Sequence, residues 1–211
     1  MDIQLVVFDW SGTIVDDRRL VYETIAKELK EYRKEIEPFD EWLTALATNT
    51  SNLPLSTFFL RKHGVKYDDG KIYNKCLNEV VKSGVKSIVY PDVMEVLEYL
   101  TIKGKKIAVV SYQPEAHIKK EAVEEGLSMF ITKMIGSAFD KTSQLINLCE
   151  EMNVKPKNAL FVGDMVPDIK TAKDAGVTSV AVATGYHPKS LLLAAKPDYL
   201  LSTLSGLKTI I

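Results

Sequence analysis

Hydrophobic runs of strand length alternate along the chain with stretches in which apolar residues recur every three or four positions. The first run, IQLVVF at residues 3–8, is apolar except for Gln4 and rich in β-branched residues, which is typical of a parallel strand covered on both faces. Similar runs occur at residues 105–111, 133–137, 158–164, 179–184 and 198–201. Helical patterns with Pro or Gly near their ends lie between these later runs. The alternation predicts repeated βαβ units, and therefore an α/β fold with a doubly wound parallel sheet.

A long helical segment separates the first hydrophobic run from the second. Five of its apolar residues recur at helical spacing: Val21, Ile25, Leu29, Tyr32 and Ile36. This spacing predicts a helix that ends before Pro38. We find no convincing strand pattern between residues 17 and 86. The sequence therefore predicts an α/β core domain of residues 1–15 and 88–211, with an all-helical domain at 16–87 inserted after the first strand.

Composition and charge exclude several classes of protein. The chain has 211 residues, of which 46% are hydrophobic and 26% charged, and these fractions are ordinary for a soluble globular protein. The 27 basic and 28 acidic residues give a net charge of −1, so we expect no binding to nucleic acid. The apolar runs are too short to cross a bilayer, and the N-terminus lacks the pattern of a signal peptide. We therefore expect a cytoplasmic protein without membrane contact, either a monomer or a homodimer.

Polar side chains follow several of the predicted strands at the point where each strand ends. Asp9 follows the first strand, Ser111 the second, and Asp164 a later one. In an open parallel sheet, ligands bind beyond the carboxyl ends of the strands, near the point where the strand order reverses. Lys141, at the start of the helix in AFDKTSQ, lies between them in the sequence. If the strands are neighbours, these four side chains converge.

Several carboxylates in one cleft indicate a cation. Asp9, Asp164 and Asp168 would repel one another in a dry cleft unless a positive charge neutralised them. Mg²⁺ prefers oxygen ligands, and it is commonly held by one or two carboxylates, waters and a substrate phosphate. Mg²⁺ is therefore the cofactor that this pattern predicts.

The remaining groups at the strand ends are suited to phosphate. Backbone N–H groups at Trp10–Gly12, the Ser111 hydroxyl and the Lys141 ammonium are all donors to phosphate oxygens. Such a set suits phosphoryl transfer, in which positioning and charge stabilisation supply most of the catalysis. A carboxylate is a known nucleophile towards phosphorus, so Asp9 is the candidate nucleophile.

Four segments together resemble the haloacid dehalogenase superfamily, the phosphohydrolases that use an aspartate nucleophile. VVFDWSGT, IAVVS, Lys141 and FVGDMVPD are similar to that family's four motifs, in the family's order. The resemblance implies that Asp9 is the nucleophile, that Ser111 and Lys141 bind phosphate, and that the acids of the fourth motif hold Mg²⁺. It also implies that the helical insert is a cap domain. We include Trp10, Gly12 and Tyr112 among the residues expected to bind the substrate.

One position departs from the family pattern. Family phosphatases usually carry a second aspartate two residues after the nucleophile, which protonates the leaving group and later activates water. Here that position is Ser11, whose hydroxyl is a poor acid or base, and losing such a group commonly costs about 10²–10⁴-fold in rate. The Ser11 carbonyl remains a candidate metal ligand, so Ser11 stays in both the catalytic and the metal sets.

The sequence favours one function and leaves two alternatives open. The favoured function is Mg²⁺-dependent hydrolysis of a small phosphorylated metabolite through an aspartyl-phosphate. Because DWSGT resembles the first motif of phosphonoacetaldehyde hydrolases, the first alternative is C–P cleavage with a cap lysine such as Lys62 or Lys75. The second is a phosphate-binding or regulatory protein of low turnover, since Ser11 replaces the acid. We expect the loop at residues 48–56 to help select the substrate.

Overall fold

The chain divides into two compact units. The computed structural model describes residues 2–46, 48, 55–65, 75, 78 and 87–211. The first unit comprises Met1–Asp16 and Val89–Ile211, and the second comprises Asp17–Ile88. That the second unit acts as a cap domain over a catalytic core stays a prediction.

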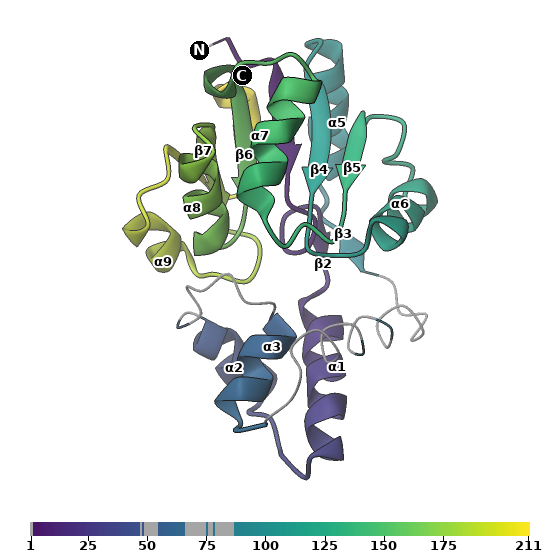
Figure 1. Ribbon diagram of the computed structural model, residues 1–211, viewed down its shortest axis with the longest axis vertical. Helices are drawn as coiled ribbons and strands as arrows, with labels where there is room; N and C mark the ends of the chain where they lie inside the picture. Colours follow the sequence, from purple (N-terminus) through teal and green to yellow (C-terminus); the bar gives the residue numbers. More distant parts are fainter. Residues whose placement is uncertain (1, 47, 49–54, 66–74, 76–77, 79–86) are drawn as a thin grey trace. The chain divides into compact units, whose positions relative to one another are not determined.

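A six-stranded parallel sheet forms the centre of the first unit (Figure 1). Across the sheet the strands are β5 (Lys133–Ile135), β4 (Lys106–Val110), β1 (Leu5–Phe8), β6 (Ala159–Gly163), β7 (Thr178–Val182) and β8 (Tyr199–Leu201). The chain builds outward from β1 to β5, then returns to the other side of β1 and builds outward again to β8. The strand order therefore reverses between β1 and β6. The predicted doubly wound α/β fold is confirmed.

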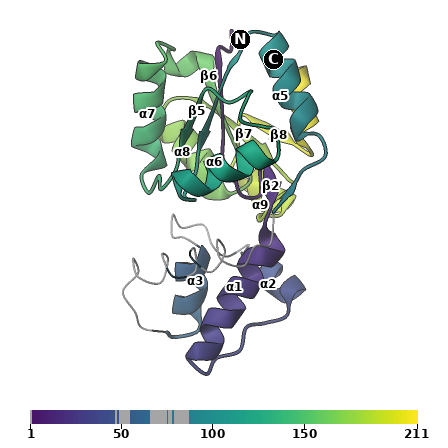
Figure 2. The same cartoon turned by 90° about the vertical axis from the view of Figure 1, so that its right-hand side faces the viewer.

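Alternate residues of the strands pack against helices on opposite faces of the sheet (Figure 2). On one face, Val6 and Phe8 of β1 share a cluster with α5 (Val93–Ile102), α6 (Glu115–Glu124) and the 3₁₀ helix η2 (Leu204–Thr209). On the other face, Leu5 and Val7 share a cluster with α7 (Lys141–Glu151) and α8 (Val166–Asp174). Two shorter helices, η1 (Pro156–Asn158) and α9 (Lys189–Ala194), lie in the connections to β6 and β8. All four β1 residues are buried, which explains the continuous hydrophobic run.

The described helices of the second unit share an aromatic core. These helices are α1 (Arg18–Glu31), α2 (Phe39–Leu46) and α3 (Leu55–Lys62). The Trp42 ring lies 5.5 Å from Tyr22 of α1, 5.8 Å from Phe39 and 5.2 Å from Phe59 of α3, measured between ring centroids. The contacts tie the three helices together, since aromatic rings bury large apolar areas.

The predicted length of the first helix is wrong. The apolar spacing indicated a helix as far as Ile36, but α1 ends at Glu31. Arg33 has a φ of 56°, and the amide of Lys34 donates to the carbonyl of Leu29 across it. A left-handed residue with this hydrogen bond closes a helix. Apolar periodicity carries no information about such a cap, so the pattern overran it.

Two very short strands were not predicted from the sequence. β2 (Val15–Asp16) and β3 (Ile88–Val89) pair with each other outside the main sheet. Two residues are too few to show the alternation by which a strand is predicted. Most of the predicted loop at 48–56 lies outside the described residues. Among the residues that are described, no helix is long and apolar enough to span a bilayer.

Candidate active site

Three adjacent strands bring most of the predicted site residues to one edge of the sheet. β1 lies between β4 and β6, and all three are parallel (Figure 1). Asp9, Ser111 and Asp164 each come directly after the last residue of their strand. They therefore lie at the carboxyl edge, where the strand order reverses and ligands bind in such sheets.

Asp9 is held in place by contacts with β6, with the next residue and with α7. Its amide donates to the carbonyl of Val162 on β6, at 2.9 Å. Its carboxylate Oδ1 accepts from the amide of Trp10 at 2.8 Å. Its other oxygen, Oδ2, lies 3.1 Å from Nζ of Lys141. Only 7% of Asp9 is exposed, so one buried ammonium faces one buried carboxylate.

Lys141 joins Asp9 to a second carboxylate. It is the first residue of α7, a helix start fixed by Asp140, whose carboxylate accepts from the amide of Ser143. From there Nζ of Lys141 also donates to Oδ1 of Asp168, at 2.9 Å. Burial alone would lower the pKa of Lys141, but the carboxylates of Asp168 and Asp9 raise it above its usual value. The ammonium therefore stays charged throughout the physiological range.

Asp168 contacts both Lys141 and the beginning of α8. Its Oδ1 accepts from Lys141, while Oδ2 accepts from the amide of Met165 at 3.1 Å, at the beginning of α8. An acidic residue in the first turn of a helix can cap the helix as well as belong to a site. The structure shows both contacts, since the two oxygens have different partners.

Asp164 is surrounded by donors and by two close glycines. Its Oδ1 accepts from Thr13 at 3.2 Å, and its Oδ2 accepts from the amide of Tyr186 at 2.7 Å. A Cβ on Gly12 would lie 2.3 Å from Oδ2 of Asp164, and one on Gly185 would lie 2.1 Å from it. Gly12 also has a φ of 75°, which favours glycine. The loop with Gly185 and Tyr186 was not predicted from the sequence, where a glycine just after a strand is its signal.

The carboxylates carry more negative charge than the site neutralises. Burial, more than any other cause, raises the pKa of Asp9 from 3.8 to about 6, with Lys141 opposing the shift. Burial also raises the pKa of Asp164 well above 3.8, and the charges of Asp168 and Asp9 add to it. When all three carboxylates are ionised, three negative charges beside one ammonium leave two, and a divalent cation would neutralise them.

The geometry of the acidic cluster fits such a cation. Asp9, Asp164 and Asp168 are all buried, and one oxygen of each lies within 4.8 Å of the others. Carboxylate oxygens are the ligands that Mg²⁺ prefers, and a cation among them would favour the ionised carboxylates against the effect of burial. The acidic cluster is therefore a candidate metal site, as the sequence predicted from the same three residues.

Two of the predicted phosphate donors, the backbone amides of Trp10 and Gly12, already have acceptors within the chain. The amides of Trp10 and Gly12 are engaged within the chain, with Asp9 Oδ1 and the Val15 carbonyl respectively. The Trp10 ring is fully buried, and its indole N–H donates to Glu121 of α6 at 2.8 Å. Phosphate binding at these two amides stays a prediction, and it requires both hydrogen bonds to rearrange. The buried Trp10 ring serves the core.

Tyr112 lies beside the ammonium of Lys141. Nζ of Lys141 is 4.9 Å from the centre of the Tyr112 ring, and that ring is 6.2 Å from Phe139. Burial raises the pKa of the Tyr112 phenol above 10.0, and Lys141 opposes this shift. Phe139 is 59% exposed, so an aromatic pair borders the charged cluster.

Ser11 and Ser111 are connected through Gln113. The side-chain amide of Gln113 donates to Oγ of Ser11 at 3.1 Å, and its backbone N–H donates to Oγ of Ser111 at 3.2 Å. The position at which the family usually has an acid is thus bordered by an uncharged amide. Sequence patterns gave no sign of Gln113, because its role depends on a contact across 102 positions of the chain.

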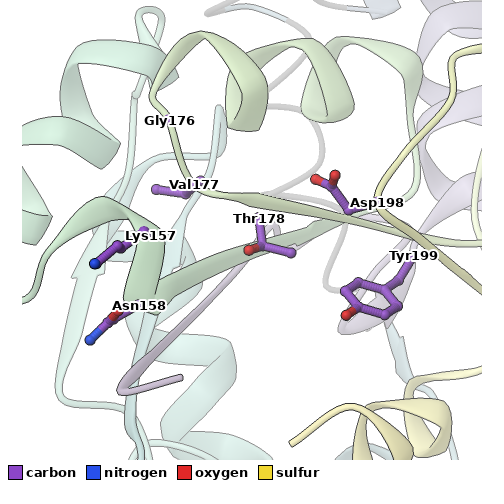
Figure 3. Close-up of a pocket in the computed structure, with 7 residues that line it drawn as sticks. All are labelled: Lys157, Asn158, Gly176, Val177, Thr178, Asp198 and Tyr199. Atoms are coloured by element: carbon purple, nitrogen blue, oxygen red, sulfur yellow. The ribbon is translucent and has the colours of Figure 1, made fainter. Parts of the chain in front are cut away.

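A hollow lies at the opposite end of the strands, away from the acidic cluster (Figure 3). It has a volume of about 690 Å³ and is lined by residues at the beginnings of β7 and β8, including Thr178 and Tyr199. Its carboxylate, Asp198, accepts from the amide and the hydroxyl of Ser179 at 2.8 and 2.6 Å. These bonds lower the pKa of Asp198, the hydroxyl contributing most. The carboxylate therefore has a structural role.

Comparison with known sequences agrees with the resemblance carried by the four motifs. Residues 6–182 match the family described as "Haloacid dehalogenase-like hydrolase". The "Phosphoglycolate phosphatase" of Pasteurella multocida is 30% identical over 130 residues, and the match covers 59% of this chain and 58% of the relative's length. A "Phosphoglycolate phosphatase" of Vibrio parahaemolyticus is 26% identical over 230 residues, covering 100% of this chain and 96% of that protein.

Known structures share the fold. The crystal structure of a "predicted phosphoglycolate phosphatase" from Haemophilus somnus superimposes with a TM-score of 0.82. That comparison covers 100% of this chain and 98% of the other, at 22% sequence identity. At this identity the similarity establishes a common fold.

Proposed function

Because the chain belongs to the haloacid dehalogenase-like hydrolase family, we propose that it is a Mg²⁺-dependent phosphohydrolase of small phosphorylated metabolites. The observation that carries this proposal is the buried group of Asp9, Lys141 and Asp168, with Asp164 beside it, at the carboxyl edge of the sheet. A nucleophilic carboxylate, a fixed ammonium and a candidate metal site are the parts that phosphoryl transfer requires.

In this proposal Asp9 is the nucleophile. Its ionised carboxylate attacks phosphorus and forms an aspartyl-phosphate, while the bond from phosphorus to the leaving oxygen breaks. Lys141 donates to the phosphoryl oxygens from its position beside Asp9, and the Ser111 hydroxyl donates from the end of β4. Water then attacks phosphorus, and the Asp9 carboxylate is released together with inorganic phosphate.

The acidic residues would hold the cofactor. Asp9, Asp164 and Asp168 supply carboxylate oxygens, and the Ser11 carbonyl is the further ligand that we propose. Bound Mg²⁺ supplies charge that reduces the repulsion between the Asp9 carboxylate and an anionic phosphate. Thr13 and the Tyr186 amide orient Asp164 by hydrogen bonds to its two oxygens.

The names of the relatives suggest a substrate to test first. Several are phosphoglycolate phosphatases, so phosphoglycolate belongs in any substrate panel. The wider substrate class, a small phosphorylated metabolite, rests on family membership and on the charge of the site. The oligomeric state and the predicted cytoplasmic location remain predictions.

The contacts of two lysines weaken the C–P alternative. A Schiff-base lysine must act as a neutral amine. Lys62 forms an ion pair with Glu37, and Nζ of Lys75 lies 2.9 Å from Glu28. Glu31, followed by Glu28, raises the pKa of Lys75 above its usual value. These partners favour the ammonium form of Lys75, and phosphate-ester hydrolysis therefore remains the favoured function.

Release of inorganic phosphate from a panel of phosphate esters tests the proposal. The wild-type protein and Asp9→Asn are compared with Mg²⁺ and with EDTA. We expect Mg²⁺-dependent release by the wild type and a loss of at least about 10²-fold in Asp9→Asn, since the amide is no nucleophile. Equal release by both proteins would remove Asp9 from the mechanism.

A further inference from the structure

Departure of the leaving group is the step that the family's usual second aspartate serves, and this chain has Ser11 in its place. When the phosphorus–oxygen bond breaks, the leaving oxygen keeps the electron pair and either receives a proton or departs as an anion. The ammonium of Lys141, the cation of the site, already donates to Asp9 and Asp168. Thr13 donates to Asp164, which is itself fully buried.

Ser11, two positions beyond Asp9, forms a neutral hydrogen-bonded pair with Gln113. Oγ of Ser11 accepts from the side-chain amide of Gln113, at 3.1 Å, so the Ser11 hydroxyl has its own proton to donate. The Gln113 backbone also binds Ser111, which ties the pair to the neighbouring strand end. A hydroxyl and an amide hydrogen-bond to an anionic oxygen, but neither transfers a proton to it near neutral pH.

We propose that the Ser11–Gln113 pair makes the site prefer phosphoryl groups with a weakly basic leaving oxygen, namely acyl phosphates and phosphoanhydrides, so that alkyl phosphate esters are hydrolysed more slowly. This inference rests on the proposed function and specifies its substrate class. The pair stabilises the departing anion by hydrogen bonding. It favours leaving groups that need no proton over alkyl phosphate esters, whose alkoxide leaving groups do.

The two steps balance without a general acid. A carboxylate oxygen of Asp9 bonds to phosphorus, and the phosphorus–oxygen bond to the leaving group breaks with both electrons going to that oxygen. The acid anion or phosphate departs as it is. Water then bonds to phosphorus, the electron pair of the phosphorus–oxygen bond returns to Asp9, and the proton of the attacking water passes to solvent.

The size of this substrate preference follows from the rate factor that a general acid contributes. A positioned general acid contributes about 10²–10⁴-fold when the leaving group needs a proton. A carboxylic acid has a pKa of about 4 and a phenol about 10. The pKa of an alkyl alcohol is well above that of a phenol and close to that of water. The missing acid therefore costs most for the alkyl ester and least for the acyl phosphate.

The experiment measures kcat/KM for acetyl phosphate, phenyl phosphate and phosphoglycolate, each with Mg²⁺. For the wild type we expect a steep decrease in that order, with the alkyl ester at least about 10²-fold below acetyl phosphate. Ser11→Asp introduces a carboxylic acid and should raise kcat/KM for phosphoglycolate by about 10²-fold, and it should raise kcat/KM for acetyl phosphate by a smaller factor. Ser202→Asp, on an exposed residue after β8, adds the same charge elsewhere and should alter neither.

Each outcome decides between distinct conclusions. If phosphoglycolate is hydrolysed within about tenfold of acetyl phosphate, and both activities are lost in Asp9→Asn, another group supplies the proton and this inference is wrong. If Asp9→Asn keeps both activities, the proposed function itself is wrong. The wild-type series decides the first point even if Ser11→Asp fails to fold.

Discussion

The proposed nucleophile should destabilise the folded protein, so removing its charge should stabilise it. Asp9 is 7% exposed, and its pKa is raised from 3.8 to about 6, with burial as the largest cause. Asp9→Asn replaces the carboxylate with a neutral group of nearly the same shape. We expect this variant to be inactive and, without Mg²⁺, more stable than the wild type at pH 7.

The magnitude follows from the difference between the two pKa values. Between pH 3.8 and about pH 6 the folded protein holds a proton at Asp9 that the unfolded chain has released. The free energy of unfolding therefore falls as the pH rises through this window. Each pKa unit corresponds to about 1.36 kcal/mol, so the ionised carboxylate costs about 3 kcal/mol above pH 6. The asparagine variant lacks this cost.

Urea unfolding of both proteins in EDTA, from pH 4 to pH 8, measures the effect. The two free energies of unfolding should be similar near pH 4 and differ by about 3 kcal/mol at pH 7, with the variant more stable. Saturating Mg²⁺ should stabilise the wild type more than the variant, because the cation binds the folded carboxylate cluster.

Asp198→Asn provides a control of opposite sign. The hydroxyl of Ser179 is the largest cause that lowers the pKa of Asp198, so this carboxylate stabilises the fold when ionised. Its replacement should reduce stability at pH 7, and the effect should fade as the pH falls through the pKa of Asp198 in the folded protein. If Asp9→Asn is instead less stable than wild type at pH 7 in EDTA, the charge balance that we assign to the site is incorrect.

Three further changes test separate parts of the site. Lys141→Met removes the partner of two buried carboxylates. It should lower kcat/KM by at least about 10²-fold and reduce the free energy of unfolding, measured in urea at pH 8, by about 3–5 kcal/mol. Wild-type activity of this variant would contradict the proposal that Lys141 binds the phosphoryl group. Asp168→Asn and Asp168→Ala should both weaken Mg²⁺ binding, measured by calorimetry. Only the alanine variant also loses the acceptor for the Met165 amide, so it should be less stable than the asparagine variant by about 1 kcal/mol. Equal stabilities of the two variants would show that this helix cap is unimportant. Gly185→Ala places a Cβ 2.1 Å from Asp164 and should weaken Mg²⁺ binding, while Gly104→Ala, with φ of 67° and no neighbour within 4 Å, should cost stability alone.

The sequence was informative where a residue's chemistry coincided with a strand end. A buried run followed by Asp9, and another followed by Asp164, mark two neighbouring strands of a parallel sheet. The convergence of these acids follows from the fold, because parallel strands end at one edge. Lys141 was predictable for a related reason, since it begins a helix on the same side.

Other parts of the site were beyond the reach of sequence patterns. Gln113 reaches Ser11 and Glu121 reaches Trp10 across more than one hundred positions, so only the folded chain brings them together. The Tyr186 amide is a backbone donor that any residue type provides, and its side chain gives no signal. Helix ends set by a left-handed residue, such as Arg33, are likewise invisible to apolar spacing.

The central claim is that Asp9 bonds covalently to phosphorus, and mass spectrometry of the acid-quenched enzyme tests it most directly. The protein is mixed with acetyl phosphate and Mg²⁺, quenched within the first turnover and digested. We predict a phosphoryl group on Asp9 in the peptide that spans β1, absent from Asp9→Asn. Phosphoryl transfer to a different side chain, with Asp9 unmodified, would contradict the account.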